Sequence, residues 1–459
     1  MARLRIAMVS EHASPLAALT GADLVGPAAR LAGLVTELGA RGHRVCVYTR
    51  RDHPDLPEVV RFAAGVEVVH VPVGPPGAVP DDALLAVTGE FGRFLAARWA
   101  AATDAAVAAR WTAATDPADA DPGTDPGGTG TADHTPDVVH AHSWTGGLAA
   151  LTATASHRIP VVVSYHGLGS TERRQRGSRD SGPDTRVGLE RELGQLADAV
   201  IADDAEEAEE LGRLGVPRGA IHVVPGGVDT ARFNPHGPAA PRASTGRQRI
   251  LGIGQPGRHD GFADLVGALR LVPGAELVLI GGPPADQLDH HPDIVELRRL
   301  ADRIGVTDRV RLIGRVPPGD VPNWYRSADV VACAPRYGPV GSAPLEAMAC
   351  GVPVVGYAVG GLAESVIDGL TGTVVSIRRG PVGDSPGREV RGLARALRGV
   401  LADTVRRMSY ASAAVDRVAS RYTWERAADD VERVYADVIA SIGRPDRSGG
   451  SLSSPQVRG

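Results

Sequence analysis

The chain has 459 residues, of which 43% are hydrophobic, and this is enough for two or three domains with sizeable cores. The formal net charge is only −5 and the positive residues are scattered, so the sequence gives no indication of a nucleic-acid partner. All 49 Lys-plus-Arg residues are arginine, which excludes Schiff-base catalysis by lysine and a P-loop lysine.

The first half of the chain alternates short runs rich in Val and Ile with Ala- and Leu-rich helical patterns, such as the one from Ala28 to Gly39. Continuous apolar strands of this kind are typical of a parallel sheet that is covered on both faces. The predicted strands are Arg5–Val9, Arg44–Tyr48, Val66–Val71, Asp137–His142, Pro160–Tyr165, Ala199–Ala202 and Ile221–Val224.

A second series of strands follows a link from Pro235 to Gln248 that contains Pro and Ser. The pattern predicts an α/β fold with two doubly wound parallel-sheet domains, one in residues 1–235 and one in residues 236–422. The predicted strands of the second domain are Arg249–Ile253, Glu276–Ile280, Arg309–Ile313, Asp329–Cys333, Val352–Gly356 and Gly372–Ser376.

Two segments lie outside this pattern. Residues 112–136 consist mainly of Ala, Asp, Thr, Pro and Gly, with almost no larger apolar side chain, and predict a disordered surface insertion. Residues 443–459 are rich in Ser, Gly and Pro and predict a disordered tail.

The first apolar run ends in a polar Ser-Glu-His sequence and is too short for the hydrophobic region of a signal peptide. No other apolar run is long enough to span a membrane. Cys46, Cys333 and Cys350 lie in or beside apolar runs without paired spacing, which is typical of core cysteines in a reducing compartment. We therefore expect a cytoplasmic location.

The most informative stretch of the chain runs from Pro335 to Glu364 and reads PRYGPVGSAPLEAMACGVPVVGYAVGGLAE. Its order of strand, Gly- and Pro-containing loop, helix and strand puts a helix N-terminus at the carboxyl end of a strand. There, backbone N–H groups and the helix dipole favour a phosphate, and Glu346 is within reach of a ribose hydroxyl. An ordinary strand, helix and strand unit with a glycine C-cap fits the same residues.

This stretch also resembles the donor-binding signature of the family 4 retaining glycosyltransferases. In that signature two Glu separated by seven residues bracket a Pro-Phe-Gly core, and Leu-Glu-Ala-Met-Ala-Cys-Gly follows. Here the second Glu is Glu346, residues 345–351 match in full, and the Gly360–Gly361 pair is present. The first Glu is replaced by Gly338 and the Phe by Val340.

The resemblance implies the GT-B fold, in which two doubly wound domains face a central cleft and a last helix, at residues 423–442, crosses back to the first domain. It also implies a nucleotide-diphosphate sugar as co-substrate. The residues implied to contact this donor are Gly341, Ser342, Ala343 and Glu346.

In the same family an Arg and a Lys after the first strand of the second domain hold the leaving diphosphate. Here residues 254–261 read GQPGRHDG, so Gln255 stands in place of the Arg and Asp260 in place of the Lys. An aspartate beside a leaving diphosphate repels it by on the order of several kcal/mol in a low-dielectric site. Arg258 is the candidate that would compensate, although a solvated loop position suits this arginine equally well.

In the first domain, His166 matches the family's histidine beside the donor sugar, and the resemblance therefore assigns it a catalytic role. His140 and His142 alternate along a predicted strand, and we expect one to point to each face of the sheet. The family's Gly-rich loop corresponds to residues 21–29, where Pro27 has no N–H to donate, so a close approach of this backbone to a ligand is disfavoured.

Two other chemistries fit less well. Residues 252–257 match the G-x-G-x-x-G fingerprint of dinucleotide sites, but the acidic residue expected about 20 positions later should close the second strand, and Glu276 opens it. His290 and His291 are adjacent in a polar loop without the spacing of a metal site. We expect neither a metal nor a resident cofactor.

Two functional hypotheses remain. The first is a retaining glycosyltransferase that moves a hexose from a nucleotide-diphosphate sugar to a small-molecule or glycan acceptor, with chemistry that is impaired or altered. The second is a non-catalytic relative that binds a nucleotide, a glycan or an enzyme partner. His166 and Glu346 favour the first hypothesis, and Gly338, Gln255 and Asp260 favour the second. The first is our working prediction.

Overall fold

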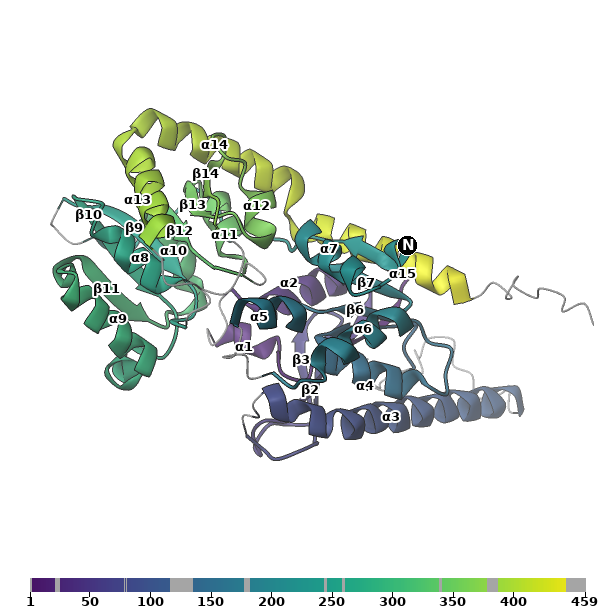
Figure 1. Cartoon of the computed structure of the whole chain (residues 1–459). Coiled ribbons are helices and arrows are strands. Elements are labelled where there is room, and N and C mark those ends of the chain that lie inside the picture. The colour runs from purple at the N-terminus through teal and green to yellow at the C-terminus, as the bar shows by residue number, and fades with distance from the viewer. Residues whose placement is uncertain are drawn as a thin grey trace, which may run out of the picture.

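Two mainly parallel sheets, one in each half of the chain, are the framework of the protein (Figure 1). The structure is a computed structural model. It describes residues 2–20, 25–77, 79, 81–115, 135–176, 182–242, 246–257, 261–337, 341–377 and 387–442.

The first domain contains eight strands and the helices that cover them. The strands are β1 (Arg5–Val9), β2 (Arg44–Arg50), β3 (Val59–Ala63), β4 (Val66–Val71), β5 (Val138–His142), β6 (Val161–Ser164), β7 (Ala199–Ala202) and β8 (Ile221–Val223). The α-helices are α1 (Leu16–Leu19), α2 (Pro27–Ala40), α3 (Asp81–Thr115), α4 (Trp144–Thr154), α5 (Gly169–Arg176), α6 (Arg186–Leu196) and α7 (Ala205–Arg213).

The strand order of this sheet is β3-β4-β2-β1-β5-β6-β7-β8, and every neighbouring pair is parallel except β3 with β4. The sequence pattern did not predict β3, because it is short, lies at the edge of the sheet and is only partly buried. It folds back onto β4 through a tight turn at Gly65, whose φ of +71° suits glycine. The expected parallel sheet therefore carries one antiparallel edge strand.

Alternate residues of the central strands pack on opposite faces of the first sheet. Ala7 and Val9 of β1 join the apolar cluster that includes residues of α3, α4 and α6, and Ile6 and Met8 join the cluster that includes residues of α2. Helix α3 extends to Thr115 and thus includes the first residues assigned to the predicted insertion. Residues 116–134 of that insertion and residues 443–459 of the predicted tail lie outside the described residues.

The second domain has a six-stranded parallel sheet in the order β11-β10-β9-β12-β13-β14. Its strands are β9 (Gln248–Ile253), β10 (Ala275–Ile280), β11 (Val310–Gly314), β12 (Val330–Cys333), β13 (Val354–Tyr357) and β14 (Gly372–Val375). The α-helices of this half are α8 (Phe262–Leu269), α9 (Pro292–Arg303), α10 (Val321–Arg326), α11 (Ala343–Ala349), α12 (Gly360–Ser365), α13 (Gly387–Ala402), α14 (Thr404–Arg421) and α15 (Trp424–Ile442).

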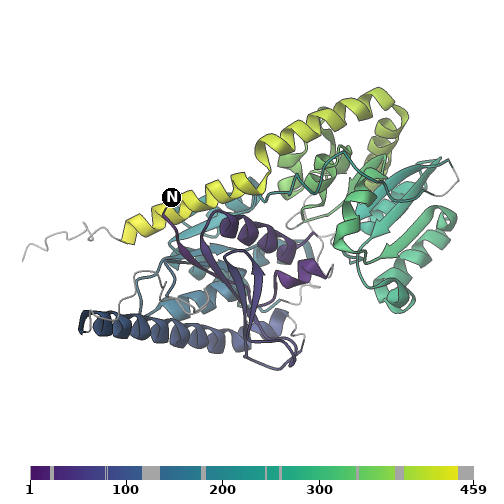
Figure 2. The same cartoon turned by 180° about the vertical axis from the view of Figure 1, so that it is seen from behind.

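The last helix joins the two halves of the chain. Helix α14 packs on the second domain, and α15 continues from it along the first domain beside α2, as both views show (Figures 1 and 2). Val431, Tyr435 and Val438 of α15 are buried in the same cluster as β1 and α2. Among the helices of the described ranges, none combines the length and apolar character needed to cross a membrane.

The docking of α15 depends on a small residue in α2, Gly33, which lies against Trp424. A Cβ at Gly33 would overlap the indole ring of Trp424. We expect Gly33→Ala to lower the free energy of unfolding by about 1–3 kcal/mol through overpacking, although alanine is the better helix former. Thermal and urea unfolding would measure the change.

Gly188→Ala in α6 is the matched control, because a Cβ there meets no atom within 4 Å. This control should be neutral or should stabilise the protein by up to about 1 kcal/mol. Equal effects of the two substitutions would contradict the proposed contact between α2 and α15.

Candidate functional site

Polar residues gather at the carboxyl ends of four neighbouring strands of the first sheet. Ser10 follows β1, His142 ends β5, His166 lies two residues after β6, and Asp203 follows β7 directly. The strand order reverses between β1 and β5, and ligands of open α/β sheets bind at such a point. The sheet topology thus brings these four residues together beside the second domain.

Asp203 is the centre of this group. Its Oδ1 accepts a hydrogen bond from Nη2 of Arg30 at 2.8 Å, and its Oδ2 lies 3.1 Å from Nδ1 of His166. Burial raises the pKa of Asp203, but the charge of Arg30 and the interaction with His166 outweigh it and lower the pKa to about 2. The carboxylate can then only accept, so Nδ1 of His166 carries a proton.

His166 has a strained backbone. Its φ is +54°, and Ser143 at the end of β5 has a φ of +85°; these are the two non-glycine residues with positive φ among the described residues. Such conformations cost on the order of 1–3 kcal/mol each and cluster at functional sites. Both residues line the same pocket, so the strain is concentrated where the candidate site lies.

His140 and His142 point to the same face of the sheet, and the prediction of opposite faces is therefore wrong. Their ring centroids lie 4.4 Å apart, because residues two positions apart on a strand share a face. Burial lowers the pKa of both, that of His140 to about 3. His140 contacts the hydroxyls of Tyr435 and Ser164, whereas Nδ1 of His142 lies 2.9 Å from Nε2 of His166.

A first pocket lies within the first domain, and we call it the first-domain pocket. Its lining includes His166, His142, Trp144, Glu172 and Arg186, and it encloses about 680 Å³, open solvent at its mouth included.

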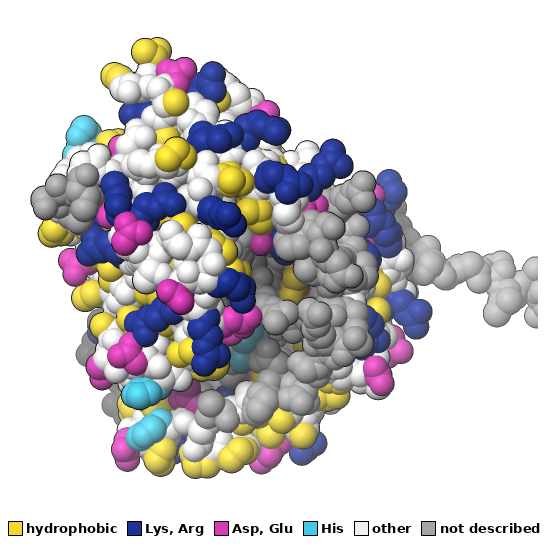
Figure 3. Space-filling model, turned by 60° about the vertical axis from the view of Figure 1, so that its left-hand side comes forward, with side chains coloured by type: hydrophobic (Ala, Val, Ile, Leu, Met, Phe, Trp, Pro, Cys, Tyr) yellow, Lys and Arg dark blue, Asp and Glu magenta, His cyan; other side chains and the backbone are white. Residues whose placement is uncertain are grey.

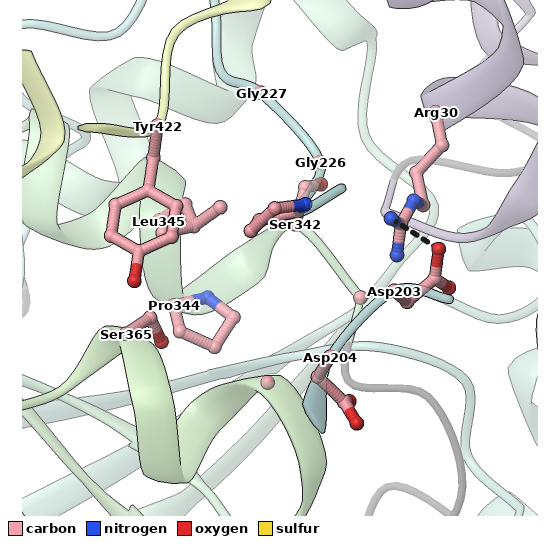
Figure 4. Close-up of a pocket in the computed structure, with 13 residues that line it drawn as sticks. Arg30, Asp203, Asp204, Gly226, Gly227, Ser342, Pro344, Leu345, Ser365 and Tyr422 are labelled. Carbon is pink, nitrogen blue, oxygen red and sulfur yellow. Dashed lines mark hydrogen bonds and ion pairs between the residues drawn. The ribbon is translucent and has the colours of Figure 1, made fainter. Parts of the chain in front are cut away.

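A second pocket, which we call the interdomain pocket, lies between the two domains. Figure 4 shows Arg30 and Asp203 of the first domain on one side and Leu345, Pro344 and Tyr422 on the other. It encloses about 510 Å³, open solvent included. Figure 3 shows a hollow near the middle of one face of the molecule, where acidic and histidine side chains are visible.

The sequence-predicted donor residues divide between the lining of the interdomain pocket and the wall behind it. Gly341 and Ser342 line the pocket, and Ala343 is a buried residue at the start of α11. The backbone N–H of Ser342 donates to the carbonyl of Val25 in the first domain at 3.0 Å, so in this arrangement it does not face an open anion site. Arg258, Gly338 and Asp260 lie outside the described residues.

Glu346 is held from both sides by hydroxyl groups. Its Oε1 accepts from Ser342 at 2.7 Å and its Oε2 accepts from Tyr325 at 2.9 Å. The residue is only 5% exposed, and burial raises its pKa to about 7 against the effect of the two hydroxyls. A ribose hydroxyl would therefore have to share or replace the hydrogen bond from Ser342.

Helices α7 and α12 cap each other across the domain boundary. Glu206 accepts from the backbone N–H of Gly360 at 3.1 Å, and Glu364 accepts from that of Ala205 at 2.6 Å. Carboxylates at helix N-termini are favourable, so the contact holds the two domains together. Two further carboxyl groups lie on this side of the cleft, and burial raises the pKa of Asp204 to about 6 and that of Glu207 to about 8, so Glu207 is mainly protonated at neutral pH.

Sequence reasoning missed Arg30 and Asp203. Arg30 is the one charged residue in the first two turns of α2, and Asp203 follows an apolar strand directly. An isolated charge near the start of an apolar helix and a carboxylate at the end of a strand both indicate candidate site residues. Their pairing was not readable, because 173 positions separate them in the chain.

Comparisons with known proteins identify the family of this chain. Residues 25–227 match the family described as "Glycosyl transferase 4-like domain", and residues 238–380 match the family described as "Glycosyl transferases group 1". The chain is 31% identical over 460 residues to D-inositol 3-phosphate glycosyltransferase 1 of Catenulispora acidiphila, covering 96% of this chain and 98% of the relative. It is 33% identical over 458 residues to D-inositol 3-phosphate glycosyltransferase of Xylanimonas cellulosilytica, with the same two coverages.

Solved structures share the fold. A sucrose-phosphate synthase from Thermosynechococcus elongatus superposes with a TM-score of 0.75 at 24% identity, over 95% of this chain and 99% of that one. The Anabaena protein HepE in complex with UDP and glucose superposes with a TM-score of 0.66 at 17% identity, over 95% of this chain and 100% of that one.

The buried carboxyl of Glu346 predicts a pH-dependent stability. Its folded-state pKa of about 7 lies above the ordinary value of 4.5, so the folded protein keeps a proton that the unfolded chain has lost. The resulting stabilisation is complete below pH 4.5 and is lost as the pH rises through about 7. Glu346→Gln should flatten this part of the stability profile by on the order of 2 kcal/mol.

Urea unfolding at a series of pH values would measure the effect. A glutamine can accept from one hydroxyl and donate to the other, which keeps the local structure. Glu296→Gln, at an exposed position of α9, is the control and should leave the wild-type profile unchanged. An unchanged profile in Glu346→Gln would show that the carboxyl of Glu346 titrates normally.

Proposed function

The chain belongs to the family 4 glycosyltransferases and has their GT-B fold, and on this premise we propose that it transfers a hexose from a nucleotide-diphosphate sugar to a hydroxyl of a small-molecule or glycan acceptor, with retention. The observation that carries this proposal is the link through Asp203. Asp203 lines the interdomain pocket, and its partner His166 lines the first-domain pocket. A donor in one pocket and an acceptor in the other would meet at this pair.

The donor belongs to the interdomain pocket in this proposal. Its diphosphate and ribose would contact Gly341, Ser342, Ala343, Glu346 and Arg258. The structural neighbour HepE is in complex with UDP and glucose, which supports a nucleotide-sugar donor. No resident cofactor or metal is part of the proposal. Transfer passes through an oxocarbenium-like state while the diphosphate leaves, so it needs negative charge near the sugar and positive charge near the phosphates.

The cleft has negative charge that could lie near the sugar, but it has few cations that could lie near the phosphates. The carboxylates of Asp203 and Asp204 lie together beside the cleft, whereas Gln255 and Asp260 stand where the family carries cations. We therefore propose chemistry that is slowed or altered, with Arg30 and Arg258 as the candidate cations. A non-catalytic role is less well supported, because relatives about 30% identical over nearly the whole chain are named as glycosyltransferases.

The acceptor belongs to the first-domain pocket, where the hydroxyl that attacks would lie beside His166. The names of the relatives specify D-inositol 3-phosphate as their acceptor. From these names we adopt a small polyhydroxy acceptor. We also propose a cytoplasmic location, which is supported by three buried cysteines that form no disulfide with one another.

The decisive experiment is a donor screen with UDP-, GDP- and ADP-sugars that measures both binding and release of the nucleoside diphosphate. We expect one nucleotide to bind and its sugar to be turned over, slowly without an acceptor and faster with one. Neither binding nor turnover with any donor would refute the proposed function.

A substitution at His166 tests the catalytic role. His166→Ala should lower turnover by about 100-fold or more, because a positioned histidine at a reacting centre contributes on this scale. Binding of the nucleoside diphosphate should change little, since His166 lines the other pocket. His236→Ala, at an exposed position, is the control. Normal turnover in His166→Ala would remove the residue from the mechanism.

A second pair of substitutions tests the missing cations. Gln255→Arg with Asp260→Lys should raise the affinity for the nucleoside diphosphate by about tenfold or more, because two charge changes favour the same anion. Gln287→Arg with Asp289→Lys makes the same changes at exposed positions near α9 and is the matched control. Titration calorimetry would compare the two, and an equal affinity in both would show that residues 255 and 260 do not face the diphosphate.

A further inference from the structure

Arg30 brings a positive charge from the first domain into the interdomain pocket. Among the described residues that line this pocket, Arg30 is the one cation, and Asp203 and Asp204 are the other charged residues. Gly341 and Ser342, which the sequence assigns to the donor, line the same cavity. Figure 4 shows the guanidinium of Arg30 pointing from α2 towards Asp203. The guanidinium and the predicted donor loop therefore border one cavity.

The guanidinium is held in place without using all of its donors. Nη2 of Arg30 donates to Oδ1 of Asp203 at 2.8 Å, and within the described ranges this is the one hydrogen bond of the Arg30 side chain. The side chain is 17% exposed, and a guanidinium has more N–H donors than one carboxylate can use. In this part of the chain Nε and Nη1 thus remain for a second anion. The ion pair with Asp203 orients the planar fork before that anion arrives.

The glycine at position 226 leaves room for this guanidinium. A Cβ at Gly226 would lie 3.1 Å from Nη2 and 3.3 Å from Nε of Arg30, which is closer than ordinary van der Waals contact. Gly226 is not among the glycines with a positive φ, so its backbone conformation does not require glycine. It lines the interdomain pocket together with Arg30. A larger residue here would press on the guanidinium or displace it.

Arg30 lies across the cleft from the positions at which the family carries its cations. Those positions, in the second domain, are Gln255 and Asp260 in this chain. From this geometry we infer that Arg30 binds the diphosphate of the donor from the first-domain side of the interdomain pocket, while its bond to Asp203 holds it in position. The diphosphate is then bound between the two domains rather than by the second domain alone. The inference rests on the proposed function and assigns a residue that binds the phosphates of the donor.

A charge-neutral double substitution tests the contact. Arg30→Gln with Asp203→Asn removes one positive and one negative charge, so the net charge of the pocket stays the same while the guanidinium is lost. Calorimetry would measure the binding of UDP, GDP and ADP, of the matching nucleosides and of inorganic diphosphate to the full-length protein. The diphosphates that bind the wild type should lose affinity at least about tenfold, because hydrogen bonds between charged groups contribute on this scale. The affinity for the matching nucleoside should change little.

Arg5→Gln with Asp137→Asn is the matched control. Nη2 of Arg5 donates to Oδ1 of Asp137 at 2.6 Å, and this pair lies at the amino ends of β1 and β5, at the opposite edge of the same sheet. The control should bind diphosphates as the wild type does. Equal diphosphate affinities in the two double variants would overturn the inference, and so would an equal loss of affinity for the nucleoside. If Arg30→Gln with Asp203→Asn does not fold, Arg30→Met with Asp203→Asn removes the same charges and is judged by the same comparison.

Failure of the inference and failure of the proposed function give different results. Unchanged diphosphate affinity in the Arg30 and Asp203 double variant, with sugar transfer by the wild type, would overturn the inference alone. The expected loss of affinity, with no sugar transfer by the wild type to any acceptor, would refute the proposed transfer and keep Arg30 as a diphosphate-binding residue. If none of the diphosphates binds the wild type, both are refuted.

Discussion

The carboxylate of Asp203 is the constraint on which the candidate site depends. A buried charge is tolerated only when it is paired and hydrogen-bonded, and Asp203 obtains its partners from two other elements, Arg30 of α2 and His166 after β6. Satisfying this one group fixes the ends of three elements relative to one another. His166, whose backbone is strained, lines the first-domain pocket, while Asp203 lines the interdomain pocket. Removing either partner would leave the buried carboxylate with one partner instead of two.

The segment that contains Asp203 also contributes to the contact between the domains. Asp203 is followed by α7, whose N-terminus exchanges carboxylate caps with α12, while the carbonyl of Val25 accepts the N–H of Ser342 on the other side of the cleft. These contacts bring several carboxylates close to the interdomain pocket. A cleft of this charge can stabilise a developing positive sugar but holds a diphosphate less readily, which is the physical basis for proposing altered chemistry.

Much of the fold was predictable from local pattern. The parallel strands were found within about two residues of their observed bounds, because a continuous apolar run between polar segments is a local property of the chain. Strand β3 was missed, since a short and half-exposed edge strand has no such run. The prediction that His140 and His142 point to opposite faces was wrong, because side chains two positions apart on a strand lie on the same face.

The sequence by itself determined the α/β class, the two-domain order and the family, because apolar periodicity and the stretch around Glu346 are encoded in neighbouring residues. It did not determine which charges meet. Arg30 with Asp203, Glu206 with Gly360 and Arg186 with Glu172 are pairs from separate elements, two of them more than 150 positions apart. Only the tertiary structure decided that Glu346 is held by Tyr325 and that Arg186 is paired with Glu190. The energy of a charge depends on its neighbours in space and on its burial, and neither is a property of local sequence.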